Sequence, residues 1–304
     1  MLSILNLIRW KNLVMIIIAQ VLIKYALFEP YAPITVLDTT RFILLVLTTL
    51  CIAAAGNIIN DIYDVDTDLV NKPDQVVIGK QISESFAYTL FFTLNVIGVL
   101  LGLYLSHSIG ESSFFSIFVI ISILLYVYAS YLKGTILIGN LLISFLVAMS
   151  IIIVGVFDIL PAAVPQIRDT QIIFLQIAGV YALFAFLINL VREIIKDIQD
   201  VDGDYKVGMN TLPIAIGRER ANKIAFALSM LPIGALIYVI VTFLYTNLIV
   251  VGYFLCFVIA PLLYCTIKMF SAEHKSHYTH LSMMYKIILG LGLVSLVLLP
   301  LLLK

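Results

Sequence analysis

The sequence predicts an all-α, polytopic membrane protein built as a bundle of nine transmembrane helices. Hydrophobic residues make up 62% of the 304 positions and charged residues only 12%, whereas about 25% charged residues is usual in a soluble domain. Apolar stretches recur along the whole chain, each about long enough to cross a hydrocarbon core of about 30 Å. Because no low-complexity linker divides them, we expect one intramembrane domain over residues 1–304.

The nine predicted spans follow one another with short connections. In chain order they cover residues 12–28, 41–60, 84–105, 114–132, 135–156, 171–191, 222–243, 248–268 and 286–303. The first stretch follows two basic residues, as in a signal peptide, but no small-residue cleavage site comes after it, so a retained helix is expected. The two longest connections, 61–83 and 192–221, hold much of the polar sequence and are expected to be functional inner loops.

Basic residues predict the orientation, because cytoplasmic loops of membrane proteins are enriched in Lys and Arg. With a cytoplasmic N-terminus, all of the eighteen Lys and Arg residues lie on the inner side except Lys24, Arg41, Arg168 and Lys304. The protein is then expected in the cell (inner) membrane with its C-terminus outside. The formal net charge is zero, which gives no indication of a nucleic-acid partner.

Two acidic clusters follow the second and sixth spans, on the same predicted side of the membrane. They consist of Asn60, Asp61, Asp64 and Asp68, and of Asp200 and Asp204. A helix would place Asp61, Asp64 and Asp68 on one face, where two carboxylates about 6 Å apart repel by roughly 3 kcal/mol at an effective dielectric near 20. A cation is therefore expected between them. Mg²⁺ suits such a site, because it takes one or two carboxylates together with phosphate oxygens of a substrate.

These clusters resemble the two aspartate-rich motifs of the UbiA superfamily of intramembrane prenyltransferases. The pattern Asn-Asp-x-x-Asp-x-x-x-Asp is matched by residues 60–68, and the pattern Asp-x-x-x-Asp is matched by residues 200–204. Four shorter segments also resemble the family, namely Arg9-x-x-Asn12, Asn71-Lys72-Pro73, Tyr131-Leu132-Lys133 and Lys206-x-Gly208. The resemblance covers essentially the whole chain. It implies nine transmembrane helices and a central cavity that faces the cytoplasm.

The resemblance also implies a reaction and the residues that perform it. A prenyl group would pass from a polyprenyl diphosphate to a lipid-like acceptor within the bilayer, with Mg²⁺ neutralising the departing diphosphate. The expected catalytic residues are Asp64, Asp68, Asp200 and Asp204, and these four with Asn60 and Asp61 are the expected metal ligands. The expected substrate-binding residues are Arg9, Asn12, Lys72, Tyr131, Lys133, Arg192, Lys196 and Lys206.

Residues 192–204 are similar to the second motif of the digeranylgeranylglyceryl phosphate synthase branch of the superfamily. Arg192 and Lys196 lie one helical turn apart, which favours an acceptor with a phosphate, such as geranylgeranylglyceryl phosphate. Members that prenylate aromatic acids typically carry Tyr in place of Lys196. One position departs from the family, because Gln75 stands where Arg is frequent, and this reduces the positive charge expected near the diphosphate.

Three alternatives stay open at this stage. The first is a UbiA-type enzyme for an aromatic or quinone precursor such as 4-hydroxybenzoate or 1,4-dihydroxy-2-naphthoate, or for a haem- or chlorophyll-related ring. The second is a cation transporter, although its ionisable residues should lie near the midplane of the membrane. The third is a catalytically silent scaffold, which would be free to lose the four aspartates.

Overall fold

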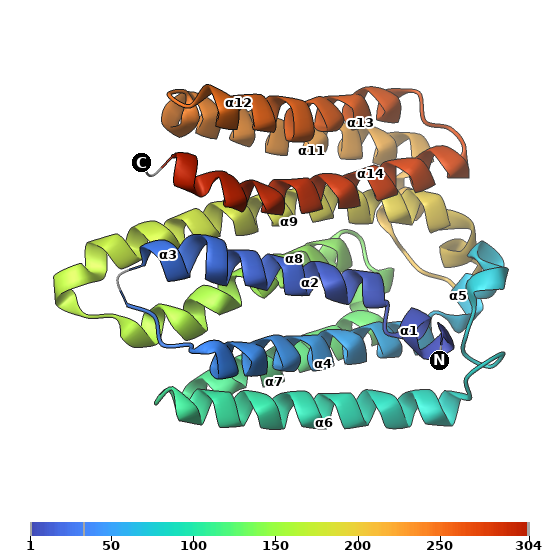
Figure 1. Cartoon of the computed structure of the whole chain (residues 1–304). Helices are drawn as coiled ribbons and strands as arrows, with labels where there is room; N and C mark the ends of the chain where they lie inside the picture. The colour runs from blue at the N-terminus through green and yellow to red at the C-terminus, as the bar shows by residue number, and fades with distance from the viewer. Residues whose placement is uncertain (1, 33, 303–304) are drawn as a thin grey trace.

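The computed structural model describes residues 2–32 and 34–302 and consists mainly of helices running roughly along one axis (Figure 1). Its α-helices are α1 (Leu2–Leu7), α2 (Trp10–Leu22), α3 (Glu29–Tyr31), α4 (Thr39–Tyr63), α5 (Val65–Asn71), α6 (Glu84–Ser108), α7 (Phe115–Ser130), α8 (Ile138–Asp158), α9 (Arg168–Lys206), α10 (Leu212–Ile216), α11 (Arg218–Val239), α12 (Leu248–Phe254), α13 (Ala260–Phe270) and α14 (Lys275–Val294). Turns of π-helix continue α2 into α3 (Ile23–Phe28) and α12 into α13 (Leu255–Ile259).

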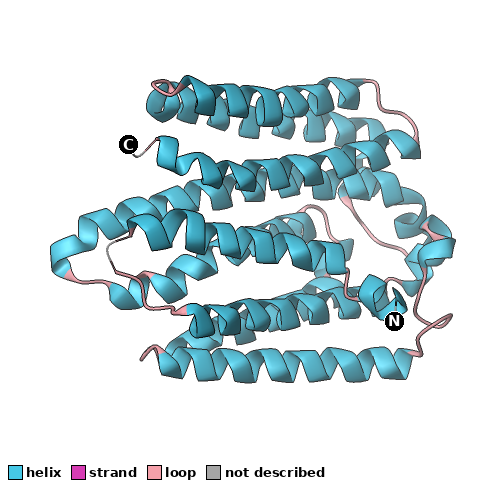
Figure 2. Cartoon of the chain, viewed as in Figure 1, coloured by secondary structure: helices cyan, strands magenta, loops and turns pink. Residues whose placement is uncertain are grey.

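Within the described residues, nine segments are helical, long and apolar enough to cross a membrane, which confirms the predicted number. The loops that join them gather at the two ends of the bundle (Figure 2). Helix α9 lies in the middle, and packs against α8, α14, α11 and α5, while α4 packs against α6 and α7. In Figure 1, α4, α6 and α7 form one side of the bundle and α11 to α14 form the other.

Small residues allow the closest helix contacts. A Cβ atom added at Gly98 of α6 would lie 2.8 Å from the side chain of Ile52 of α4. Inside a membrane, helices associate mainly through close van der Waals packing, and glycine lets two backbones approach. This close contact holds the middle of α4, the helix that ends in the first acidic cluster, against α6.

The prediction that residues 61–83 and 192–221 are loops is wrong for much of their length, because both segments contain helices. Helix α9 has 39 residues and continues to Lys206, so the second acidic cluster lies on a helix and not in the loop 192–221. At 1.5 Å per residue this helix is about 58 Å long, nearly twice the hydrocarbon thickness. In the loop 61–83, residues Val65–Asn71 form α5, and α14 begins at Lys275, well before the predicted position 286. Hydropathy marks where apolar residues end, whereas these helices continue with polar residues.

The two termini lie at opposite ends of the bundle (Figure 1). Arg41 and Arg168 lie at the beginnings of α4 and α9, at the end of the bundle opposite α5. These are two of the four basic residues predicted outside; a third, Lys304, lies outside the described residues.

An ion pair is buried at this end of the bundle, away from α5. Lys24 Nζ lies 3.1 Å from Asp158 Oδ2, and the two side chains are 1% and 0% exposed. The other carboxylate oxygen of Asp158 accepts hydrogen bonds from the backbone N–H groups of Val36 and Leu37, at 3.1 and 2.8 Å. The connection between α3 and α4 is therefore fixed to the last residue of α8.

Candidate functional site

A cavity of about 840 Å³ is lined by residues of α2, α4, α5, α7, α8, α9 and α14. Its charged residues lie where α4 ends and α2 begins. Farther along the same helices the walls are mostly apolar, with residues such as Met15, Ile52, Leu146 and Leu293. One space therefore combines a charged end with an apolar interior, which suits a lipid carrying a charged head group.

The first acidic cluster lies at the junction of α4 and α5. Asp64 sits between the two helices, accepts a hydrogen bond from Asn60 Nδ2 at 2.6 Å and pairs with Lys133. Burial lowers the pKa of Lys133, but the charge and hydrogen bond of Asp64 outweigh it and raise the pKa overall. The second oxygen of this carboxylate, Oδ1, is buried without a hydrogen-bond partner among the described residues.

Asp68 lies in the first turn of α5, where the helix dipole favours negative charge. Burial and the neighbouring charge of Asp64 nevertheless raise the pKa of Asp68, more than Lys72 and Lys133 lower it. A cation bound beside Asp68 would oppose this shift and favour the carboxylate.

The second acidic cluster is carried by α9. Asp200 and Asp204 are one turn apart, and Lys72 Nζ lies 2.6 Å from Asp200 Oδ2. Asp200 Oδ1 is buried and has no partner in the part of the chain that the structure describes. Asp204 is 4% exposed and its side chain makes no hydrogen bond or ion pair with a described residue.

Asn71 and Gly203 hold the two clusters together. The Asn71 side chain donates to the carbonyl of Asp200 at 2.7 Å and accepts from the backbone N–H of Gly203 at 3.1 Å. A Cβ atom at Gly203 would lie 2.7 Å from the carbonyl oxygen of Thr67, so only glycine fits between α5 and α9. Residues 129 and 132 positions apart are thereby fixed at one end of the cavity.

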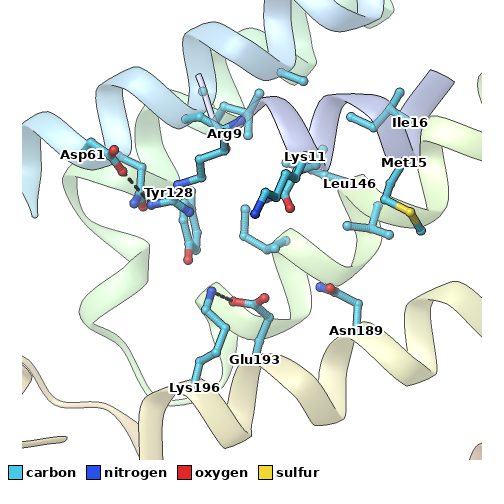
Figure 3. A pocket seen from close by; sticks show the side chains of 18 of the residues that line it. Arg9, Lys11, Met15, Ile16, Asp61, Tyr128, Leu146, Asn189, Glu193 and Lys196 are labelled. Carbon is cyan, nitrogen blue, oxygen red and sulfur yellow. Dashed lines mark hydrogen bonds and ion pairs between the residues drawn. The ribbon is translucent and has the colours of Figure 1, made fainter. Parts of the chain in front are cut away.

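Arg9 closes the first cluster from the side of α2. It adopts φ of 51° between α1 and α2, a left-handed conformation that is uncommon for residues other than glycine. Its Nη2 lies 2.6 Å from Asp61 Oδ1. Burial is the largest single influence and lowers the pKa of Arg9, but the charge and hydrogen bond of Asp61 together with the charge of Asp64 outweigh it, so the net shift is upward. Tyr128 lies beside this pair (Figure 3).

A second group of charged residues lines the cavity on α9, one to two turns before Asp200. Glu193 pairs with Arg192 Nη1 at 3.0 Å and with Lys196 Nζ at 2.8 Å. Asn12 of α2 accepts a hydrogen bond from Lys286 of α14 at 2.6 Å. Figure 3 shows Glu193 and Lys196 on one wall of the cavity, across from Arg9 on the other.

Most of the predicted site residues line this one cavity. They are Arg9, Asn12, Asn60, Asp61, Asp64, Asp68, Lys72, Lys133, Arg192, Lys196, Asp200 and Asp204. The structure leaves two outside it, because Tyr131 is 73% exposed and Lys206 is exposed at the last residue of α9. The sequence prediction assigned no role in the site to Asn189, Glu193, Asp197 or Lys286, which also line the cavity. Three of these residues could have been found from the sequence, because Asn189, Glu193 and Asp197 recur every four residues next to an apolar stretch.

The acidic clusters fit Mg²⁺. Among the described residues, no three His, Cys, Asp or Glu side chains form a group that could hold a metal ion by themselves. Mg²⁺ needs no such closed cage, because it takes one or two carboxylates and completes its coordination with water and substrate phosphates. The unpartnered Oδ1 atoms of Asp64 and Asp200 provide oxygen donors of this kind. Lys133 pairs with the other oxygen of Asp64, and Lys72 pairs with the other oxygen of Asp200.

Comparison with solved structures shows a shared fold. A digeranylgeranylglyceryl phosphate synthase is similar over 97% of this chain and 96% of its own, with a TM-score of 0.64 and 25% sequence identity. A UbiA homologue from Archaeoglobus fulgidus, bound to DMAPP and Mg²⁺, is similar over 97% of this chain and 99% of its own, with a TM-score of 0.59 and 18% identity.

Comparison with known sequences gives the family. A digeranylgeranylglyceryl phosphate synthase of Methanobrevibacter smithii is 32% identical over 253 residues, 81% of both chains. Another, from Methanopyrus kandleri, is 38% identical over 189 residues, and the match spans 62% of this chain and 63% of that relative. Residues 21–301 match the description "UbiA prenyltransferase family". This multi-pass membrane protein therefore belongs to the UbiA prenyltransferase family.

Proposed function

We propose that this protein transfers a geranylgeranyl group from a polyprenyl diphosphate to geranylgeranylglyceryl phosphate, depends on Mg²⁺ and releases diphosphate. One observation carries the proposal. Asp64 and Asp200, from motifs far apart in the chain, face one cavity next to an apolar interior, and each keeps a buried oxygen without a partner among the described residues. The relatives named as digeranylgeranylglyceryl phosphate synthases support the choice of acceptor.

The reaction breaks the allylic C–O bond of the donor, so negative charge grows on the diphosphate while positive charge spreads over the allylic carbons. Mg²⁺ bound at Asp64, Asp68, Asp200 and Asp204, with Asn60 and Asp61 at the edge of the site, would supply Lewis-acid and electrostatic stabilisation of the leaving group. The chain itself contributes Lys72 and Lys133, whose remaining N–H groups are free to donate to phosphate oxygens.

The rest of the cavity accommodates the two lipids. Its apolar walls exclude water from the allylic cation, which water would otherwise capture. Tyr128 lines the cavity beside Arg9 and can present its π face to the cation. Lys206 and Tyr131 remain predicted substrate-binding residues; both are exposed, and each lies two positions from a cavity-lining residue, Asp204 and Lys133 respectively.

We further propose that the N-terminus and the site face the cytoplasm and that the C-terminus is outside. The distribution of basic residues supports this, because Lys72, Lys133 and Lys206 lie at the end of the bundle with the acidic clusters, opposite Arg41 and Arg168. Residues 1–304 are proposed to act as one domain, since the site draws on helices from both halves of the chain.

Product analysis tests the proposed function. Purified protein is incubated with Mg²⁺ and geranylgeranyl diphosphate, and with either geranylgeranylglyceryl phosphate, 4-hydroxybenzoate or 1,4-dihydroxy-2-naphthoate. Mass spectrometry is expected to find a prenylated product only with the phosphorylated glyceryl ether. Product with an aromatic acceptor alone would overturn the choice of acceptor. The absence of any product would overturn the enzymatic proposal itself.

A further inference from the structure

We propose that Lys286, Arg192 and Lys11 form the binding site for the acceptor's phosphate, distinct from the acidic end that takes the donor's diphosphate. The inference deepens the proposed function and rests on it. The sequence prediction placed the acceptor's phosphate at Arg192 and Lys196. In the structure Arg192 and Lys196 both pair with Glu193, whereas Lys286, which forms no ion pair with a described residue, enters the cavity from another helix.

Lys286 is a charged residue in a cavity wall without a compensating carboxylate. It lies on α14, in a segment long and apolar enough to cross the membrane, and lines the cavity. Its Nζ donates one hydrogen bond, to Asn12 Oδ1 at 2.6 Å, and it forms no ion pair with any described residue. Two of its three N–H groups therefore remain for a ligand. An uncompensated cation at such a position is costly and indicates a function.

Arg192 reaches the same place from α9. Its Nε donates to the carbonyl oxygen of Ser282 at 3.3 Å, one helical turn before Lys286 on α14. Nη1 is occupied by Glu193, whereas Nη2 makes no hydrogen bond to a residue that the structure describes. Lys11 adjoins Asn12 in the chain, lines the cavity and likewise has no ion pair within residues 2–32 and 34–302. Three elements thus bring cationic groups together around Asn12.

The charge in the cavity is divided between its two parts. The part of the cavity lined by residues 192–197 of α9 together with Lys11 and Lys286 has four cations, Lys11, Arg192, Lys196 and Lys286. It has two carboxylates, Glu193 and Asp197, and Asp197 accepts a hydrogen bond from Asn140 at 2.8 Å. At the other part, five aspartates of the two motifs face only Arg9, Lys72 and Lys133. An acid-rich part suits metal ions with a diphosphate, whereas a part with excess positive charge suits an anion bound directly. A phosphate monoester is such an anion, and Arg and Lys are its usual partners.

The spacing along α9 supports two separate phosphate sites. Arg192, Lys196, Asp200 and Asp204 recur every four residues, so they form one slowly winding stripe on the helix. Arg192 and Asp200 are about 12 Å apart along the axis, at 1.5 Å per residue. A phosphate beside Arg192 and a diphosphate beside Asp200 therefore leave room between them for the acceptor's hydroxyl and the donor's first carbon.

Steady-state kinetics of Lys286→Gln tests the site. The substrates are geranylgeranylglyceryl phosphate and its dephosphorylated alcohol, each at saturating geranylgeranyl diphosphate and Mg²⁺. We expect the KM for the phosphorylated acceptor to rise roughly ten- to hundred-fold, as for the loss of a charge-assisted hydrogen bond. The KM for the donor and the rate with the alcohol should stay near wild type. Lys286→Arg should restore most of the preference, because it keeps the charge.

Lys268→Gln is the matched control, because Lys268 is exposed on α13 and does not line the cavity. It should leave every constant unchanged. Equal losses with the phosphorylated and the dephosphorylated acceptor in Lys286→Gln would overturn the inference, as would an unchanged KM for the phosphorylated one. If the wild-type protein transferred no prenyl group to either acceptor, the proposed function itself would fail. The wild-type reaction thus separates the two failures.

Discussion

At the scale of single residues, the acidic clusters are the part of the site that the sequence predicted best. Their spacing made a cation site expected, and the structure brings Asp64 and Asp200 to one cavity. Their partners could not be predicted in the same way. Lys133 and Lys72 contact carboxylates 69 and 128 positions away in the chain, and no local pattern indicates which lysine meets which aspartate.

Asp64→Asn and Asp200→Asn should each lower prenyl transfer by roughly a hundred-fold or more, because each removes a charged oxygen donor beside the leaving group. Chelation of Mg²⁺ should stop the reaction, and added Mg²⁺ should restore it. Product formation measured over a range of Mg²⁺ concentrations tests this. Asp66→Asn is the control, since Asp66 is an exposed carboxylate on the same helix α5. Full activity of either site variant without metal would contradict the proposed role of the carboxylates.

The ion pair of Lys24 and Asp158 predicts an effect on stability. Lys24→Met would leave the Asp158 carboxylate buried with only two backbone N–H groups, and should destabilise the protein by about 3–5 kcal/mol. Denaturation of the purified protein in detergent measures this. Lys24→Met with Asp158→Leu should lose less, because no unpaired charge remains. A single variant as stable as wild type would mean that the pair is replaceable by water.

At the scale of elements, the hydropathy of the sequence located the spans but misjudged the lengths of α9 and α14. Polar residues at 189, 192, 193, 196 and 197 end the apolar stretch, yet they keep helical spacing and line a cavity. Hydropathy averaged over a window of residues falls where these polar residues begin, so the predicted span ends at residue 191. The periodicity of these polar residues was the signal that the helix continues.

The contact between α5 and α9 leads to a prediction. Gly203→Ala should push α5 away from α9, because the new methyl group would overlap the carbonyl of Thr67, and overpacking of this kind costs about 1–3 kcal/mol. The two acidic clusters would separate, so half-maximal activity should require more Mg²⁺. Gly179→Ala is the matched control on the same helix, since nothing lies within 4 Å of its added Cβ. Equal Mg²⁺ dependence of the two variants would contradict this role of Gly203.

At the scale of the whole molecule, the number of spans was predictable because each is a contiguous apolar segment. The arrangement of the helices was not, since α9 contacts α5, α8, α11 and α14 through residues spread over the chain. The central cavity follows from that arrangement. Its two oppositely charged parts therefore became visible only in three dimensions.

The proposed orientation is tested by thiol labelling in a background without native cysteines. Tyr205 is 74% exposed near the end of α9, whereas Gly203 is buried against α5 and cannot carry a probe. Tyr205→Cys should react with an impermeant reagent only after the membrane is opened. Gln166→Cys, exposed between α8 and α9 at the opposite end, should react in intact cells. The reverse pattern would overturn the proposed topology.

The stripe of charged residues on α9 has a consequence for the substrates that the protein accepts. Helix α9 separates Arg192 from Asp200 by about 12 Å along its axis, so it would set the distance between the two proposed phosphate sites. An acceptor whose hydroxyl lies several bonds farther from its phosphate should then be a poor substrate, even though its charge is correct. Selection by length would thus come from the pitch of a single helix, whatever the apolar tails of the lipids.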